Sequence, residues 1–165
     1  MKSCNWILRV VMAFALSSVA SAADDAPLVG TWRPTAVTTV TLKTNAVTKL
    51  FGDNPIGLLQ YTRGGHMVVF LSTGTPHQPQ GNVLTDEDRA AIHKGIIGAY
   101  AGKYRIEGSK VIHQVTAAWW PHFIGSEQTR FFEVSGSTLT LKTAPFVSPR
   151  TGEEIVSTLT WERVE

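Results

Sequence analysis

The sequence predicts an all-β protein whose strands form an eight-stranded antiparallel up-and-down barrel with one helix inserted between strands three and four. Three observations predict this fold: short alternating apolar and polar runs, glycine-rich turns between them, and a single helical pattern. A meander of eight strands can remove its exposed edges by closing on itself, which favours a barrel. A β-sandwich of the same strands is the alternative.

Residues 1–22 have the three-part layout of a secretory signal peptide. A short segment with Lys2 and Arg9 leads into an apolar run at 10–16, and small residues follow up to Ala22. The apolar run is much shorter than the roughly 20 residues that span a bilayer. We therefore expect residues 1–22 to be removed and residues 23–165 to form one barrel domain. The protein is then expected to be secreted or periplasmic, with no integral membrane segment after cleavage.

Removal of this segment would change the charge of the protein. The full sequence has 15 basic and 13 acidic residues, and the loss of Lys2 and Arg9 would lower the basic count from 15 to 13. The single cysteine, Cys4, would be lost as well. A formally neutral chain without clustered Lys and Arg predicts no nucleic-acid partner. A chain without cysteine forms no disulfide and has no thiol nucleophile.

The strands follow one another in short runs along the chain. The first, over 28–43, is rich in Val and Thr, and Pro34 indicates a bend in it. A polar connection at 45–55 leads to a hairpin that pairs 56–62 with 66–71 around two glycines. The remaining strands are expected at 100–107, 110–118, 127–134, 138–143 and 155–164.

The one predicted helix begins after Thr85. Thr85 is a candidate N-cap, and three acidic residues follow it in the first turn, where the helix dipole favours negative charge. Capping accounts for these carboxylates better than a catalytic role does. Apolar residues then recur at helical spacing and predict a stripe that lies against a sheet; they are Ala91, Ile92, Ile96 and Ala99.

Several motifs resemble those of a known family. Gly30-Thr31-Trp32 opens the first strand, and Trp161-Glu162-Arg163 ends the last. The runs 52–62, Gly-Asp-Asn-Pro-Ile-Gly-Leu-Leu-Gln-Tyr-Thr, and 125–131, Gly-Ser-Glu-Gln-Thr-Arg-Phe, match at similar separations. From Leu28 onward the chain resembles the bacterial lipocalin-like domain proteins, which implies a calycin-type barrel. It lacks the Thr-Asp-Tyr signature and the cysteines of typical lipocalins.

The resemblance implies a structural role for two of these residues. In lipocalins the tryptophan of the Gly-x-Trp motif packs across the closed end of the barrel, and a basic residue after the last strand lies over its ring. Trp32 and Arg163 match those positions. A guanidinium stacked on an indole adds roughly 0.5 to 2 kcal/mol. We therefore expect this pair to close one end of the barrel.

The first candidate binding cluster consists of His113, Gln128 and Arg130. Alternation along two neighbouring strands brings His113 near the other two if the connecting loop folds back. Among apolar residues, an arginine fork there would bind a ligand carboxylate or enolate. Alternatively, the three side chains lie on the wet outer face, or are satisfied by Glu127 or Glu133.

The second candidate is the loop 119–123, Trp-Trp-Pro-His-Phe. Its aromatic residues would be costly to expose without purpose, and barrel mouths are common ligand entrances. The alternative is a plug over the barrel end. With Tyr61 added to the lining, the predicted ligand-binding residues are His113, Gln128, Arg130, Tyr61, Trp119, Trp120 and Phe123.

These residues predict that a small, largely apolar or amphipathic molecule binds in the barrel lumen. No nucleotide-binding glycine loop or nucleophile elbow occurs, and the five histidines lack metal-ligand spacing, so we expect no cofactor and no metal. One alternative is an isomerase, cyclase or hydrolase with His113 as acid or base and Arg130 stabilising an oxyanion. The other is an interaction domain with a filled core, in which the aromatic loop docks a partner.

Overall fold

A computed structural model describes residues 27–49 and 51–165, so the predicted signal peptide lies outside the described residues. Eight strands form the barrel wall: β1 (Gly30–Thr41), β3 (Ile56–Tyr61), β4 (His66–Ser72), β5 (Ile96–Glu107), β6 (Lys110–Ala118), β7 (Glu127–Ser135), β8 (Thr138–Thr143) and β10 (Glu154–Arg163). Two short strands, β2 (Ala46–Thr48) and β9 (Phe146–Val147), lie within predicted connections. The helices are α1 (Asp86–Gly95) and the short 3₁₀ helix η1 (Pro121–Phe123).

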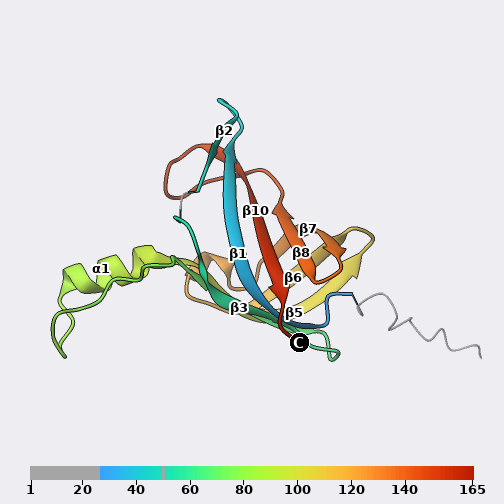
Figure 1. Ribbon diagram of the computed structural model, residues 1–165, viewed down its shortest axis with the longest axis horizontal. Coiled ribbons are helices and arrows are strands. Elements are labelled where there is room, and N and C mark those ends of the chain that lie inside the picture. Colours follow the sequence, from blue (N-terminus) through green and yellow to red (C-terminus); the bar gives the residue numbers. More distant parts are fainter. Residues whose placement is uncertain (1–26, 50) are drawn as a thin grey trace, which may run out of the picture.

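The wall is a closed antiparallel meander. Each wall strand pairs with its neighbours in chain order, and β1 also pairs with β10, so the sheet closes on itself (Figure 1). The pairing between β1 and β3 covers only residues 30–32 of β1. The β1–β10 register runs from Trp32 opposite Arg163 to Thr41 opposite Ile155, with an irregularity at Pro34, where the sequence predicted a bend. This closure confirms the predicted barrel and excludes the sandwich.

The two ends of the barrel differ in their connections. Because the strands run up and down, every second connection lies at the same end. Tight turns at 62–65, 108–109 and 136–137 join strands at one end, where Gly65, Gly108 and Gly136 adopt positive φ. The long connections lie at the other end, over 42–55, 73–95, 119–126 and 144–153. We call these the closed end and the open end.

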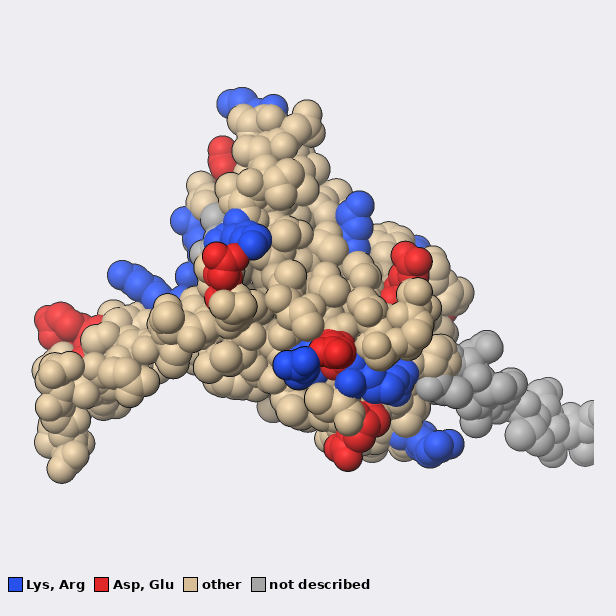
Figure 2. All heavy atoms as spheres, in the orientation of Figure 1, with Lys and Arg blue, Asp and Glu red and all other residues tan. Residues whose placement is uncertain are grey.

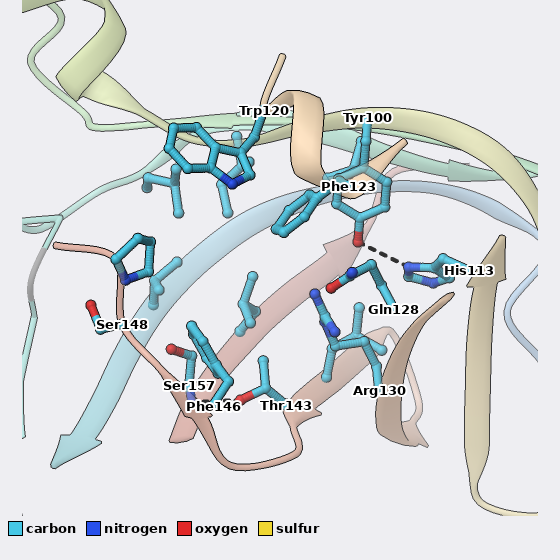
Figure 3. A pocket seen from close by; sticks show the side chains of 18 of the residues that line it. Tyr100, His113, Trp120, Phe123, Gln128, Arg130, Thr143, Phe146, Ser148 and Ser157 are labelled. Atoms are coloured by element: carbon cyan, nitrogen blue, oxygen red, sulfur yellow. Dashed lines mark hydrogen bonds between the residues drawn. The ribbon is translucent and has the colours of Figure 1, made fainter. Parts of the chain in front are cut away.

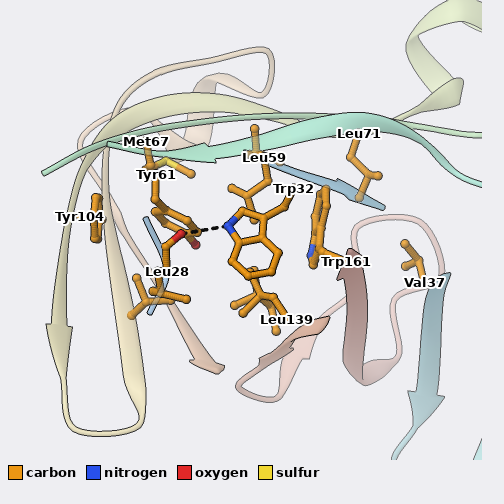
Figure 4. Packing of buried hydrophobic residues seen from close by; sticks show 13 residues of the cluster. Leu28, Trp32, Val37, Leu59, Tyr61, Met67, Leu71, Tyr104, Leu139 and Trp161 are labelled. Carbon is orange, nitrogen blue, oxygen red and sulfur yellow. Dashed lines mark hydrogen bonds between the residues drawn. The ribbon is translucent and has the colours of Figure 1, made fainter. Parts of the chain in front are cut away.

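Large side chains fill the closed end (Figure 4). Trp32 is fully buried, and its indole Nε1 donates a hydrogen bond to the carbonyl of Leu28 at 2.9 Å. The guanidinium of Arg163 lies 4.0 Å from the centre of the Trp32 ring. The same guanidinium donates to the carbonyls of Val29 and Pro27. These contacts tie the segment before β1 to the last strand across the barrel end.

The N-terminus of α1 is capped as predicted. The Thr85 hydroxyl accepts a hydrogen bond from the backbone N–H of Asp88 at 3.1 Å, and the Asp88 carboxylate accepts from the backbone N–H of Thr85 at 3.0 Å. This reciprocal pair is a capping box. The helix lies between β4 and β5, which are the third and fourth strands of the wall in chain order.

The predicted apolar stripe of this helix is wrong. The helix ends at Gly95, and Ile96 and Ala99 belong to β5, where they pair with the end of β4. No residue of α1 is buried, and Ile92 is exposed. Figure 1 shows the helix extending away from the barrel. The ladder with β4 therefore overrides the helical spacing of the apolar residues from Ile96 onward.

Charged side chains of both signs are interspersed on the face seen in Figure 2, over the barrel as well as on the protruding helix segment. Among the described residues, two exposed ion pairs join different strands: Arg33 of β1 with Glu162 of β10, and Arg105 of β5 with Glu127 of β7. Exposed pairs of this kind contribute little to stability. Within the described ranges, no helix is both long enough and apolar enough to cross a membrane.

Candidate functional site

The open end holds a cavity of about 810 Å³ (Figure 3). Apolar side chains from the inner face of the wall form much of its surface, among them Val37 of β1, Leu71 of β4 and Leu141 of β8. Ligand pockets in proteins have volumes of roughly 300–1,000 Å³ and are mostly apolar. The barrel is thus filled at its closed end and hollow at its open end, in contrast to the alternative of a filled core.

The structure places six of the seven predicted binding residues on the wall of this cavity: His113, Gln128, Arg130, Trp119, Trp120 and Phe123. Tyr61 is not on the cavity wall. It is the last residue of β3, next to a tight turn, and it lies in the closed-end core with 1% of its surface exposed. Tyr61 therefore lies deeper in the barrel than the cavity, on the side of the closed end, and contacts His113.

The register between β6 and β7 assembles the polar cluster. His113 pairs directly with Gln128, and Arg130 follows two residues later on β7, opposite Val111. Because alternate residues of a strand face the same side, Gln128 and Arg130 both point into the barrel beside His113 (Figure 3). The amide Nε2 of Gln128 donates to the Ser126 hydroxyl at 2.8 Å, which leaves its carbonyl oxygen as an acceptor.

Arg130 has no carboxylate partner among residues 27–49 and 51–165. Its Nη1 donates to the carbonyl of Thr129 at 2.8 Å. Glu127, one of the two predicted alternatives, instead binds Arg105 on the outer face at 2.7 Å. Glu133, the other alternative, is exposed. The lumen thus contains a guanidinium whose charge the described residues do not neutralise, and such a group favours an anionic partner.

His113 is held between two tyrosines. The Tyr61 hydroxyl lies 2.7 Å from its Nε2. The Tyr100 hydroxyl lies 2.9 Å from its Nδ1, a contact that Figure 3 shows. Burial, reinforced by the nearby Arg130 charge, lowers the pKa of His113 to about 3, so the ring is neutral at neutral pH. Burial also raises the pKa of both tyrosines, and Arg130 opposes that rise.

A neutral imidazole offers one donor and one acceptor, and both ring nitrogens of His113 already have partners. The ring therefore has no nitrogen left for a ligand unless one of these hydrogen bonds breaks. This geometry does not favour the alternative in which His113 acts directly on a substrate as acid or base. It gives His113 a positioning role between Tyr61 and the cavity.

Tyr100 is not among the predicted site residues, although it lines the cavity. Its ring meets Phe123 edge to face, with the ring centres 6.0 Å apart. Alternation along β5 places Tyr100 and Tyr104 on the same face with Gly102 between them, which is a signal that could have identified it. Tyr104 lies deeper, where its hydroxyl donates to the carbonyl of Thr62 at 2.9 Å.

Aromatic residues form one side of the cavity rim. Trp119 meets His93 edge to face at 4.4 Å between ring centres and lies 5.8 Å from Trp120. The connection after β6 turns through η1, which brings Phe123 back over the cavity. Figure 3 shows Trp120, Phe123 and Tyr100 on the same side of the cavity. The loop 119–123 thus borders an open cavity. It does not fill the end of the barrel, as a plug would.

The other histidines lie apart from the polar cluster. His77 pairs with Asp88 of α1 at 2.6 Å, His93 and His122 contact the rings of Trp119 and Trp120, and His66 is exposed at the start of β4. In the part of the chain that the structure describes, no group of three or more His, Cys, Asp or Glu side chains could hold a metal ion.

Because the imidazole of His113 is buried and neutral, we expect the free energy of unfolding to fall in acid. In the unfolded chain the pKa of His113 returns to about 6.5, whereas in the folded protein it is about 3. The unfolded state therefore binds the proton first, and the free energy of unfolding falls as pH drops from 6.5 toward 3, by up to about 1.4 kcal/mol per pH unit. Above pH 6.5 this contribution is constant.

Urea unfolding at pH 7 and pH 5 measures this effect, with His113→Gln as the variant that removes the titrating ring. The other groups that face the ring are Tyr61, Tyr100 and Arg130, and both tyrosines have a raised pKa. We expect the wild type to lose more stability than the variant between these two pH values. Equal losses would contradict a neutral, buried His113.

A family model described as a lipocalin-like domain matches residues 29–164. No curated protein and no solved structure matches the chain. The matched segment begins just before β1 and ends just after β10, so it spans the whole barrel wall together with the cavity and the polar cluster.

Proposed function

The chain belongs to the lipocalin-like domain family, and we propose that it binds a small, largely apolar molecule with an acidic end in its barrel lumen. The observation that carries this proposal is an open cavity of about 810 Å³ that combines apolar walls with Arg130, a cation without a carboxylate partner among the described residues. The fold supports small-molecule binding, and the cavity lining supports this class of ligand.

The two parts of the lining would act on different parts of the ligand. Apolar surface removed from water contributes roughly 25 cal/mol per Å², so the aliphatic and aromatic walls would supply most of the affinity. The guanidinium of Arg130 would fix the orientation, since its planar fork matches a carboxylate through two parallel hydrogen bonds. An amphipathic acid satisfies both requirements.

The place of action is proposed from the sequence. Residues 1–22 have the layout of a secretory signal peptide, and the rest of the chain contains no cysteine that a change of redox compartment would affect. We accordingly propose that the barrel acts outside the cytoplasm, in the periplasm or the extracellular medium, where it would hold a poorly soluble molecule.

Titration with cis-parinaric acid, a fluorescent fatty acid, tests the proposal. We expect saturable fluorescence enhancement and, in native mass spectrometry, one ligand per chain. Phe123→Ala, which removes a cavity-lining ring, should weaken binding about tenfold. Phe131→Ala, on the exposed outer face of β7, is the matched control and should bind as the wild type does. Absence of saturable binding, or equal effects of the two variants, would overturn the proposal.

A further inference from the structure

We propose that the Tyr61–His113–Tyr100 chain is oriented so that Tyr100 donates its hydroxyl hydrogen into the cavity, which makes the site selective for an oxygen anion over an amine. This inference rests on the proposed function and adds what sets the chemistry of the ligand's polar end. It assigns Tyr100 as a binding residue, and it assigns Tyr61 and His113 as positioning residues.

Two arrangements of hydrogen atoms fit the distances of 2.7 Å and 2.9 Å in this chain. In the first, Tyr61 donates to Nε2 of His113, and the Nδ1–H of the ring donates to Tyr100. In the second, Tyr100 donates to Nδ1, and the Nε2–H of the ring donates to Tyr61. In each arrangement, one hydroxyl hydrogen makes no hydrogen bond within these three residues. It is the hydrogen of Tyr100 in the first arrangement and that of Tyr61 in the second.

Burial decides between the two arrangements. Tyr61 is 1% exposed, and among the described residues its hydroxyl has one hydrogen-bond partner, His113. The second arrangement would therefore strand a hydroxyl hydrogen in the core. The first places the spare hydrogen on Tyr100, which lines the cavity and can donate it to water or to a ligand. A stranded buried donor is disfavoured by about tenfold or more, so the first arrangement dominates.

Arg130 acts on the same point of the cavity. A guanidinium only donates hydrogen bonds, and Arg130 opposes the effect of burial on the Tyr100 hydroxyl by lowering its pKa. Figure 3 shows Arg130 and Tyr100 directed toward one region of the lumen. Two donors, one of them cationic, thus meet there. A carboxylate or enolate oxygen can accept from both, whereas an ammonium group would face the charge of Arg130.

The tautomer of His113 tests the orientation without any ligand. Long-range ¹H–¹⁵N correlation spectra of the ligand-free protein at neutral pH should show the hydrogen of the His113 ring on Nδ1. A ring with its hydrogen on Nε2 would overturn the inference, even if cis-parinaric acid binds. Conversely, the Nδ1–H form without any fatty-acid binding would refute the proposed function while supporting this orientation of the chain.

Selectivity supplies the second test. Dodecanoate should displace cis-parinaric acid at a concentration about tenfold or more below that required for dodecylamine. Tyr61→Phe removes a hydroxyl that does not line the cavity, so a merely structural role would leave both the tautomer and this ratio unchanged. We expect the variant to lose the Nδ1–H preference and to bind dodecanoate about tenfold more weakly.

Tyr104→Phe is the matched control for this variant, because it removes a tyrosine hydroxyl that donates to the backbone carbonyl of Thr62. It should keep the wild-type tautomer and the wild-type preference for dodecanoate. If Tyr61→Phe behaves like Tyr104→Phe in both measurements, or if dodecylamine competes as well as dodecanoate, the inference is wrong.

Discussion

Replacing Arg130 by methionine should weaken the binding of cis-parinaric acid about 100-fold, because the ligand carboxylate would lose the cationic partner that lies beside His113 and Gln128 on the cavity wall. Methionine keeps a long apolar side chain and removes the charge. The methyl ester of the same fatty acid has no anionic end, so its affinity should change by less than about threefold. Parallel fluorescence titrations of acid and ester measure both effects.

Arg105→Met is the matched control for this experiment. Arg105 lies on the outer face of β5, where its guanidinium pairs with Glu107 and Glu127, and it does not line the cavity. Its replacement should leave the affinity for the acid unchanged. A loss of similar size in both variants, or an equal loss for acid and ester in Arg130→Met, would show that the Arg130 charge does not bind the carboxylate.

Stability separates this effect from misfolding. Arg130 carries a charge in the lumen that no described carboxylate neutralises, and such a charge costs free energy in the folded, ligand-free protein. Arg130→Met should therefore unfold at the same urea concentration as the wild type or at a higher one. A folded variant of undiminished stability that has lost the acid, but not the ester, isolates the role of the guanidinium.

The polar cluster could be predicted because it depends on local patterns. The period of two along neighbouring strands determines that His113, Gln128 and Arg130 share one side of the sheet, and the antiparallel connection brings the strands together. The alternation could not show that side to be the inside, since apolar residues occur on both faces: Phe70 and Leu58 are exposed on the outer wall. Closure of the barrel determines which face of the sheet points into the lumen.

Tyr61 shows a second limit of the pattern. Alternation assigns residues to a common face of a strand and not to a depth along the barrel axis, so it could not show that Tyr61 lies behind the cavity. Depth depends on which end carries the tight turns, and β3 ends at such a turn directly after Tyr61. Tyr100 was missed for a different reason. The helical spacing of Ile96 and Ala99 assigned those residues to the helix, which hid the start of β5 just before Tyr100.

Replacing Trp32 by alanine should lower the free energy of unfolding by about 3–5 kcal/mol, the range for truncating a large buried aromatic side chain. The ring is fully buried, its Nε1 donates to Leu28, and Arg163 stacks on it at 4.0 Å. The variant would lose all three contacts and leave a void at the closed end. Urea unfolding followed by tryptophan fluorescence and by circular dichroism measures the change.

Phe70→Ala provides the comparison, because Phe70 is a large aromatic residue of the same barrel that is 49% exposed on the outer wall. It should cost less than about 1 kcal/mol. Trp32 does not line the cavity, so the folded fraction of Trp32→Ala should still bind cis-parinaric acid. A cost for Trp32→Ala no greater than that for Phe70→Ala would mean that the closed end is held by its tight turns and strand pairing, since the core around Trp32 would then contribute nothing measurable.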